Sequence, residues 1–243
     1  MRHPNNNLIP HFYRKLFKHY GPQGWWPVTP SHGERPLYKL KKSLTRNSES
    51  EKFEICLGAI LTQNTNWENV VKALGELKRH DALNVKAILS LPSKRLEKLI
   101  RSSGYFRQKA NRTKIFFRSV FKKNKKLGDF LGGTAREGRK KLLAISGIGP
   151  ETADSMLLYA QGHPAFVVDA YTRRIGERWG ILKGGESYEE VQKIFTRALP
   201  ASVDLFGEYH ALLVRLGKEV CRKKPLCERC CLKVRCPGRK RFS

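Results

Sequence analysis

The residues best suited to chemistry lie between Leu142 and Trp179, where a glycine turn is followed by a single carboxylate. The turn contains Gly147 and Gly149, and Pro150 comes directly after it. Glycine permits backbone angles and close approaches that a side chain forbids, and proline suits the first turn of a helix. The stretch therefore predicts two helices joined by a tight hairpin, whose bare amides at a helix N-terminus can bind a phosphate.

Asp169 is the candidate reactive group of this stretch. It follows the apolar run 166–168 and precedes a helical pattern over 171–179. A carboxylate held on a rigid scaffold can stabilise positive charge on a substrate or deprotonate a water molecule. Asp is also a common N-cap, so capping of the following helix is the alternative role. With a phosphate seat just upstream, we favour catalysis on a DNA sugar.

The charge of the chain points to a polyanionic partner. Lys and Arg number 48 against 21 Asp and Glu, which gives a formal net charge of +27 over 243 residues. Such a field attracts nucleic acid in a salt-sensitive way, and an anionic membrane is the weaker alternative. No apolar run approaches the ~20 residues of a spanning helix. The first seven residues lack the apolar core of a secretion signal. We expect a monomeric, nucleoid-associated protein of the cytoplasm that does not bind membranes.

The pattern of apolar residues predicts an all-α fold of about ten helices. Strand-like alternation is absent apart from 165–168. Elsewhere the apolar residues recur at helical spacing. The stripes cover residues 9–20, 53–61, 70–77, 85–89, 96–100, 110–121, 188–199 and 206–220.

Cysteine use indicates a metal site. Five of the six cysteines lie between residues 221 and 236, and the sixth is Cys56. Disulfides are rare in a reducing cytosol, so a tight cluster of this kind favours metal ligation.

Taken together, the hairpin, Asp169 and the terminal cysteines resemble the helix–hairpin–helix DNA glycosylase superfamily, in its endonuclease III branch. The resemblance runs from about Trp25 to Cys236. It implies an all-α, two-lobed fold with DNA in the cleft. One lobe is a six-helix barrel, and both chain ends form the other. We therefore expect residues 1–50 (N-terminal helix and aromatic loop) and 161–243 in the terminal lobe, and 51–160, with the hairpin, in the barrel lobe.

The resemblance extends to the cysteine loop, which reads Cys221-x5-Cys227-x2-Cys230-x5-Cys236. It is similar to the iron–sulfur loop of the family, whose first gap is usually one residue longer. Four thiolates are what a [4Fe–4S] cluster needs, and a structural zinc ion is the alternative. Cys231 offers a competing ligand beside Cys230.

Position 151 separates this chain from the lyases of the family. Bifunctional members carry there the lysine that forms a Schiff base with the sugar, whereas this chain has Glu151. A carboxylate cannot form an imine, so the resemblance implies a monofunctional glycosylase that uses water. Capping of the helix dipole is the alternative role of Glu151. In the family, Asp169 corresponds to the essential aspartate.

Within the superfamily, several motifs look like the 3-methyladenine DNA glycosylase III subfamily. They are Trp25-Trp26-Pro27, Phe53, Leu61-Thr-Gln-Asn-Thr65, Gly147-Ile-Gly-Pro-Glu-Thr-Ala-Asp154 and Leu216-Gly-Lys218. A purine methylated on the ring is cationic, and aromatic faces attract such a cation by roughly 0.5–2 kcal/mol. We therefore expect Glu151 to assist in a pocket. The expected pocket residues are Trp25, Trp26, Phe53 and Lys218. Ordinary packing is the alternative for the three aromatic side chains, and simple solvation is the alternative for Lys218.

The resemblance also assigns residues to damaged double-stranded DNA. Gln63 aligns with a position that fills the gap left by a flipped nucleotide, and Tyr105 or Phe106 would press on the opposite strand. The hairpin would bind phosphate, with a bridging monovalent cation, through residues Gly147, Ile148, Gly149 and Thr152. For Gln63 the alternative is a helix C-cap, and for Tyr105 and Phe106 it is ordinary packing. The expected function is removal of alkylated bases; alternatives are excision of oxidised pyrimidines, uracil or mismatched thymine, and non-catalytic binding of damaged DNA.

Overall fold

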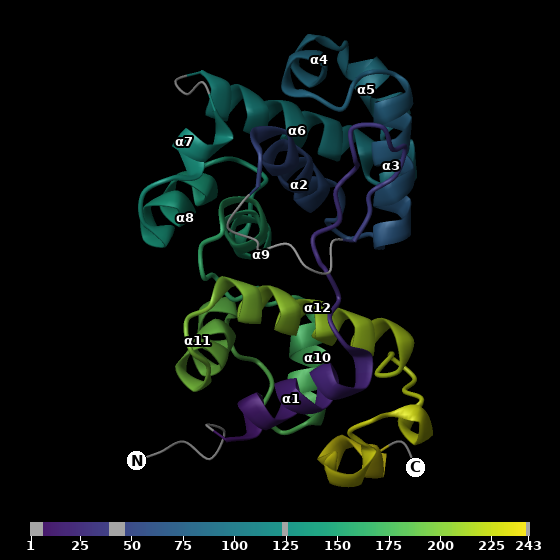
Figure 1. Cartoon of the computed structure of the whole chain (residues 1–243), viewed down its shortest axis with the longest axis vertical. Helices are drawn as coiled ribbons and strands as arrows, with labels where there is room; N and C mark the ends of the chain where they lie inside the picture. The colour runs from purple at the N-terminus through teal and green to yellow at the C-terminus, as the bar shows by residue number, and fades with distance from the viewer. Residues whose placement is uncertain (1–6, 39–46, 123–125, 242–243) are drawn as a thin grey trace. The chain divides into compact units, whose positions relative to one another are not determined.

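The computed structural model describes residues 7–38, 47–122 and 126–241 of the chain. Part of the N-terminal segment considered above, residues 1–6, lies outside them. The described residues form helices and loops, with one isolated antiparallel bridge between Val28 and Leu37 (Figure 1). The predicted all-α class is confirmed, and residues 165–168 form no strand. Within the described ranges, no helix is long and apolar enough to cross a membrane.

The chain folds as two compact units. Residues 1–25 and 166–243 form one, here called the terminal unit, and residues 26–165 form the other, here called the central unit. The described residues 26–38 and 47–50 thus cluster with the central unit, whereas the resemblance implies that residues 1–50 join the terminal lobe; residues 39–46 of that segment also lie outside the described residues. The second boundary lies at residue 165, five residues later than expected.

Helices make up both units. The α-helices of the central unit are α2 (Glu49–Leu61), α3 (Trp67–Arg79), α4 (Val85–Ser90), α5 (Ser93–Leu99), α6 (Phe106–Phe121), α7 (Leu127–Leu131), α8 (Ala135–Leu143) and α9 (Pro150–Ser155). A 3-10 turn, η2 (Arg101–Ser103), precedes α6, and a π-helix, η3 (Met156–Gln161), continues α9. The terminal unit contains α1 (Leu8–Tyr20), α10 (Ala170–Arg178), α11 (Tyr188–Ala198), α12 (Val203–Glu219) and the 3-10 turns η4 (Cys227–Arg229), η5 (Lys233–Arg235) and η6 (Pro237–Arg241).

Contacts of the loop after Trp26 explain why it belongs to the central unit. The main-chain N–H and the hydroxyl of Thr29 both donate to the buried carboxyl of Glu54 on α2, at 2.8 and 2.7 Å. The Trp26 ring meets Trp67 of α3 edge-on, with ring centres 5.3 Å apart. These polar and aromatic contacts hold the loop against α2 and α3.

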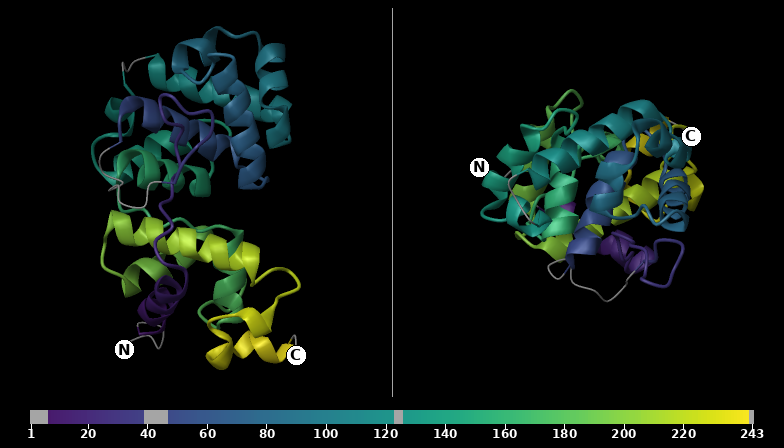
Figure 2. Two further views of the ribbon diagram at one scale, coloured as in Figure 1. Left: turned by 45° about the vertical axis from the view of Figure 1, so that its right-hand side comes forward. Right: turned by 90° about the horizontal axis from the view of Figure 1, so that it is seen from above.

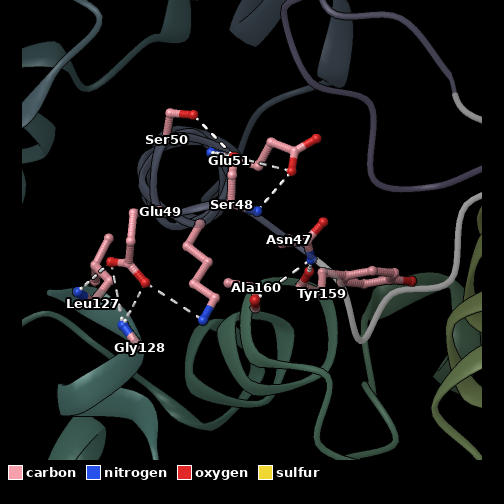
Figure 3. A network of polar contacts seen from close by, with 10 residues as sticks. Asn47, Ser48, Glu49, Ser50, Glu51, Leu127, Gly128, Tyr159 and Ala160 are labelled. Atoms are coloured by element: carbon pink, nitrogen blue, oxygen red, sulfur yellow. Dashed lines mark hydrogen bonds and ion pairs between the residues drawn. The ribbon is translucent and has the colours of Figure 1, made fainter.

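The start of α2 is fixed by three sets of hydrogen bonds (Figure 3). Ser48 and Glu51 form a reciprocal capping box, which satisfies two orphan amides of the helix. The Glu49 carboxylate accepts from the first two amides of α7, at 2.7 and 3.1 Å. Asn47 donates to the Tyr159 carbonyl in the π-helix at 2.7 Å. The N-terminus of α2 therefore joins α7 to the element that follows the hairpin.

The predicted hairpin lies between α8 and α9. Gly147 has a φ of +87°, in the left-handed region that favours glycine, and Gly149 has a φ of −90°. Pro150 opens α9 as predicted. The buried Asp154 of α9 pairs with Arg139 of α8 at 2.9 Å, which ties the two arms of the hairpin together.

An aromatic cluster and one long-range hydrogen bond hold the terminal unit together. Phe166 stacks on Phe195 with centres 4.7 Å apart and meets Phe206 edge-on. The Tyr209 hydroxyl on α12 donates to the Ile9 carbonyl of α1 at 3.0 Å. α1 and α10 both contact α12 (Figures 1 and 2). The segment that delivers Asp169 is thus anchored in a packed core.

The two hairpin glycines should respond differently to alanine. A Cβ on Gly147 would lie 2.6 Å from the Arg112 Cγ, and the left-handed backbone adds roughly 1–2 kcal/mol. We expect Gly147→Ala to lower the free energy of unfolding by about 2 kcal/mol. Gly149→Ala meets open space and should change it by about 0.5 kcal/mol or less. Denaturant unfolding of both variants measures this, and equal effects would contradict it.

Candidate functional site

Gln63 is bonded directly to the hairpin. Its amide nitrogen donates to the Gly147 carbonyl at 3.1 Å and to the Thr152 hydroxyl at 3.0 Å. Its amide oxygen accepts from Arg112 on α6 at 2.6 Å. Three residues predicted to contact DNA, Gln63, Gly147 and Thr152, are therefore brought together. The C-cap of α2 is Thr62, so the alternative reading of Gln63 as that cap does not hold.

The hairpin offers fewer free amides than the resemblance implied. The Ile148 N–H donates to the Ile145 carbonyl at 3.1 Å, inside the turn, and Ile148 is buried. The expectation that Ile148 supplies an amide to phosphate therefore does not hold, because the turn itself consumes that donor. The N–H groups of Gly147 and Gly149 have no acceptor among the described residues. These two amides are the candidate phosphate donors.

Tyr105 and Phe106 differ in exposure. Tyr105 is 66% exposed and has a φ of +45°, directly after Gly104 with a φ of +69°. A bulky residue in this region is uncommon and marks a shaped turn. Phe106 begins α6 and is half-buried, with the Arg107 guanidinium 5.9 Å from its ring centre. Tyr105 is therefore the better placed of the two to meet a ligand.

Lys109 holds the turn before Tyr105 against the end of α2. The sequence patterns did not identify this lysine as a functional residue. Its ammonium donates to the carbonyls of Leu61 and Ser103, at 2.7 and 2.6 Å, and its side chain is buried. Burial, followed by the nearby Arg112 charge, lowers the pKa of Lys109 to about 8. Lys109 still carries its proton at neutral pH. The available signal was a lysine in the buried stripe of α6.

Asp169 takes the capping role that the sequence offered as the alternative to catalysis. It is the N-cap of α10, with one carboxylate oxygen accepting from the Thr172 N–H at 2.7 Å and from the Thr172 hydroxyl at 2.9 Å. The other oxygen lies 3.5 Å from Nε2 of His210 on α12. The side chains of Asp169 and His210 are only 11% and 8% exposed.

This environment keeps Asp169 ionised. Burial acts first and raises its pKa, but the hydrogen bond and charge of His210 and the two bonds from Thr172 outweigh it. The net effect is a pKa below the usual range of an aspartic acid. In the sequence His210 lies within the apolar stripe 206–220, and a polar residue on such a stripe is the signal that could identify it.

The predicted pocket residues occupy unlike surroundings. Trp26 is buried against Trp67 and Tyr159. Phe53 is buried against Phe117. Both side chains therefore take the packing role that was the alternative to a pocket. Trp25 is half-buried at the end of the terminal unit's first segment.

The two charged candidates are exposed. Glu151 lies in the first turn of α9, where an acid also favours the helix dipole. Lys218 lies in the last turn of α12.

Four cysteines line one pocket of the terminal unit. They are Cys221, Cys227, Cys230 and Cys236, whereas Cys231 does not line it. Trp179, Leu216 and Val220 supply apolar walls, and Arg178 donates to the Cys221 sulfur at 3.3 Å.

The four cysteines around this pocket match in number the thiolate ligands of a [4Fe–4S] cluster and of a structural zinc ion. Among the described residues, no three His, Cys, Asp or Glu side chains are grouped as one metal ion requires. A [4Fe–4S] cluster binds each thiolate to a different iron, so its ligands lie farther apart than those of zinc. Four thiol groups that line one pocket are compatible with a [4Fe–4S] cluster, and the choice between cluster and zinc is a proposal.

Comparisons with known proteins agree with the family resemblance of the sequence. Residues 57–201 match the family described as HhH-GPD superfamily base excision DNA repair protein. The chain is 36% identical over 239 residues to "Putative DNA repair glycosylase MJ1434" of Methanocaldococcus jannaschii, covering 97% of this chain and 99% of that one. It is 32% identical over 200 residues to endonuclease III of Thermotoga maritima, covering 82% and 89%.

One solved structure resembles the chain over most of its length. The 3-methyladenine DNA glycosylase of H. pylori, bound to 1,N6-ethenoadenine, superposes with a TM-score of 0.68 at 27% identity, over 88% of this chain and 97% of that one. The family match, the relatives of nearly equal length and the shared fold agree with the hairpin and with the capped Asp169. The chain belongs to the HhH-GPD superfamily of base excision DNA repair proteins.

Proposed function

We propose that the chain is a monofunctional DNA glycosylase that removes alkylated purines, 3-methyladenine first, by hydrolysis. The observation that carries the proposal is the buried, ionised carboxylate of Asp169, fixed at the start of α10. The likeness to the H. pylori 3-methyladenine glycosylase supports the choice of base. Excision of oxidised pyrimidines, uracil or mismatched thymine is the second candidate, and the chain is also similar to endonuclease III.

Asp169 would act on the sugar. When the bond between the base and C1′ breaks, the base leaves with the bonding electrons and positive charge develops on the sugar. A carboxylate anion with fixed geometry stabilises that charge and can take the proton of the attacking water. Burial increases the effect because it excludes solvent that would screen the carboxylate. The hydroxyl of the water ends on C1′, the cationic base leaves as a neutral molecule, and the remaining proton passes to Asp169 and then to solvent.

Glu151 supports both parts of the proposal. A carboxylate at the position of the family's Schiff-base lysine leaves water as the nucleophile. Its negative charge also favours a cationic methylated base over a neutral one. Trp25, half-buried where Trp26 and Phe53 are packed away, is the remaining candidate for an aromatic face toward that base.

DNA is the proposed partner, held by groups of the central unit. The free amides of Gly147 and Gly149 would bind a phosphate, with a bridging monovalent cation at the hairpin. Gln63 would exchange its bonds to Gly147 and Thr152 for contacts in the duplex as the base leaves the stack.

The same proposal assigns a [4Fe–4S] cluster to Cys221, Cys227, Cys230 and Cys236. The cluster would contribute folding energy by cross-linking the C-terminal loop. Arg178 would assist by donating to the Cys221 sulfur and to the carbonyls of the loop after it. Zinc remains the alternative group.

Replacing Asp169 separates catalysis from binding. Asp169→Asn removes the negative charge but keeps a side-chain oxygen for capping α10. We expect base release in single turnover to fall by a factor of about 100 or more, while affinity for damaged duplex stays similar or rises. Asp81→Asn, at an exposed position of the central unit, serves as the control. Unchanged base release by Asp169→Asn would contradict the catalytic assignment.

Neutralising Glu151 should affect cationic bases selectively. We expect Glu151→Gln to slow release of 3-methyladenine by about tenfold and release of a neutral base much less. Glu68→Gln is the matched control, because Glu68 is also an exposed acid in the first turn of a helix. Equal losses on both bases would contradict a charge-reading role.

The cysteine assignment predicts colour. The purified protein should absorb broadly in the visible range and contain iron and sulfide in equal amounts. Cys230→Ser should lose this absorption, whereas Cys231→Ser should keep it. Of these two neighbouring cysteines, Cys230 lines the pocket and Cys231 does not. Colourless protein that contains zinc would contradict the cluster.

A further inference from the structure

We propose that His210 is a positioning residue for base hydrolysis, which holds the second carboxylate oxygen of Asp169 and preserves its negative charge. The inference rests on the proposed catalytic role of Asp169. His210 itself would touch neither the base nor the sugar.

The geometry divides the Asp169 carboxylate between two helices. One oxygen is engaged by the first turn of α10, through the Thr172 N–H and hydroxyl at 2.7 and 2.9 Å. The other lies 3.5 Å from Nε2 of His210, which belongs to α12. Anchors on two elements fix the plane of the carboxylate as well as its position. A near-attack geometry needs that restraint, because small misplacements cost large factors in rate.

The part of α12 that carries His210 is packed into the core of the terminal unit. His210 is buried in the middle of α12, next to Tyr209, whose hydroxyl donates to the Ile9 carbonyl at 3.0 Å. Phe166, just before Asp169, meets the Tyr209 ring edge-on. The core of the terminal unit therefore sets the separation between His210 and Asp169.

The cationic side chains of α10 are directed elsewhere. Arg173 donates to the Glu186 carbonyl at 2.7 Å. Arg174 donates to the carbonyls of Gly217 and Cys221, at 3.0 and 2.9 Å.

Other ionisable groups around the pair do not replace His210. Tyr171 of α10 has a pKa raised by burial and then by the Asp169 charge. From α11, the Tyr188 hydroxyl accepts from the Val168 N–H at 3.3 Å.

The remaining charged groups of α12 have partners of their own or face solvent. Arg215 pairs with Glu219, and Glu208 accepts from the Gln23 N–H. Lys218 is exposed.

The negative charge of the Asp169 carboxylate depends on its contact with His210. Burial raises the pKa of Asp169, and His210 is the largest influence that lowers it, followed by Thr172. Without His210, burial is opposed only by Thr172, so the pKa of Asp169 rises. The acid limb of the pH–rate profile, below which Asp169 is protonated, must then move to higher pH. A purely structural residue would change the rate without moving this limb.

The test uses single-turnover release of 3-methyladenine by the full chain over the range in which Asp and His titrate. We expect His210→Ala to lower the rate at neutral pH by about 10- to 100-fold and to move the acid limb to higher pH. His210→Gln keeps a hydrogen-bond donor but cannot carry a positive charge. It should restore part of the rate and leave the acid limb between the positions found for the wild type and for His210→Ala, because it replaces the hydrogen bond but not the charge.

A second histidine provides the control. His163, with Nε2 3.3 Å from the Leu131 carbonyl in the central unit, is replaced in His163→Gln, which should leave both the rate and the limb unchanged. DNA affinity and melting temperature are measured for every variant. If His210→Ala does not fold, the displaced limb of His210→Gln tests the inference alone.

Two results would overturn the inference. One is a wild-type rate and limb in the His210 variants. The other is a lower rate with an unmoved limb that His210→Gln does not rescue. The proposed function is tested separately: an active Asp169→Asn would refute it, whereas an inactive Asp169→Asn with unaffected His210 variants would refute only the role of His210.

Discussion

The proposed chemistry depends on one largely buried carboxylate that stays ionised. Asp169 reaches this state because α10 begins at that residue and because α12 places His210 beside its second oxygen. Burial alone would favour the neutral acid, which could not stabilise a cationic sugar. The aromatic core around Phe166 and the bond from Tyr209 to Ile9 therefore serve function as well as stability, because they set the distance between the two helices.

A second constraint operates in the central unit, where α6 joins the elements proposed to contact DNA. Lys109 holds the turn before Tyr105 to the end of α2, and three residues later Arg112 bonds to Gln63. Gln63 in turn bonds to the hairpin at Gly147. Two cations on one helix thus tie the turn before Tyr105 and, through Gln63, the hairpin to α6.

Sequence patterns predicted the helices, the hairpin and the capping by Asp169, because periodicity, glycine and N-cap signals act over a few residues. They could not reveal which partners meet across long separations. His210 looked like one more residue on an apolar stripe, and the turn's own use of the Ile148 amide depended on backbone angles that the sequence does not display. Phe53 shows the converse, since a side chain assigned to a pocket packs in the core against Phe117.

The most direct test of the central claim is a side-by-side excision assay with wild-type protein. Matched duplexes would carry 3-methyladenine, an oxidised pyrimidine, uracil or a mismatched thymine, and both free base and strand cleavage would be measured. We expect 3-methyladenine to be released fastest of these bases. The abasic sites should stay uncut until alkali is added. Release of only the oxidised or mismatched bases, or strand cleavage that borohydride traps as a covalent complex, would contradict that claim.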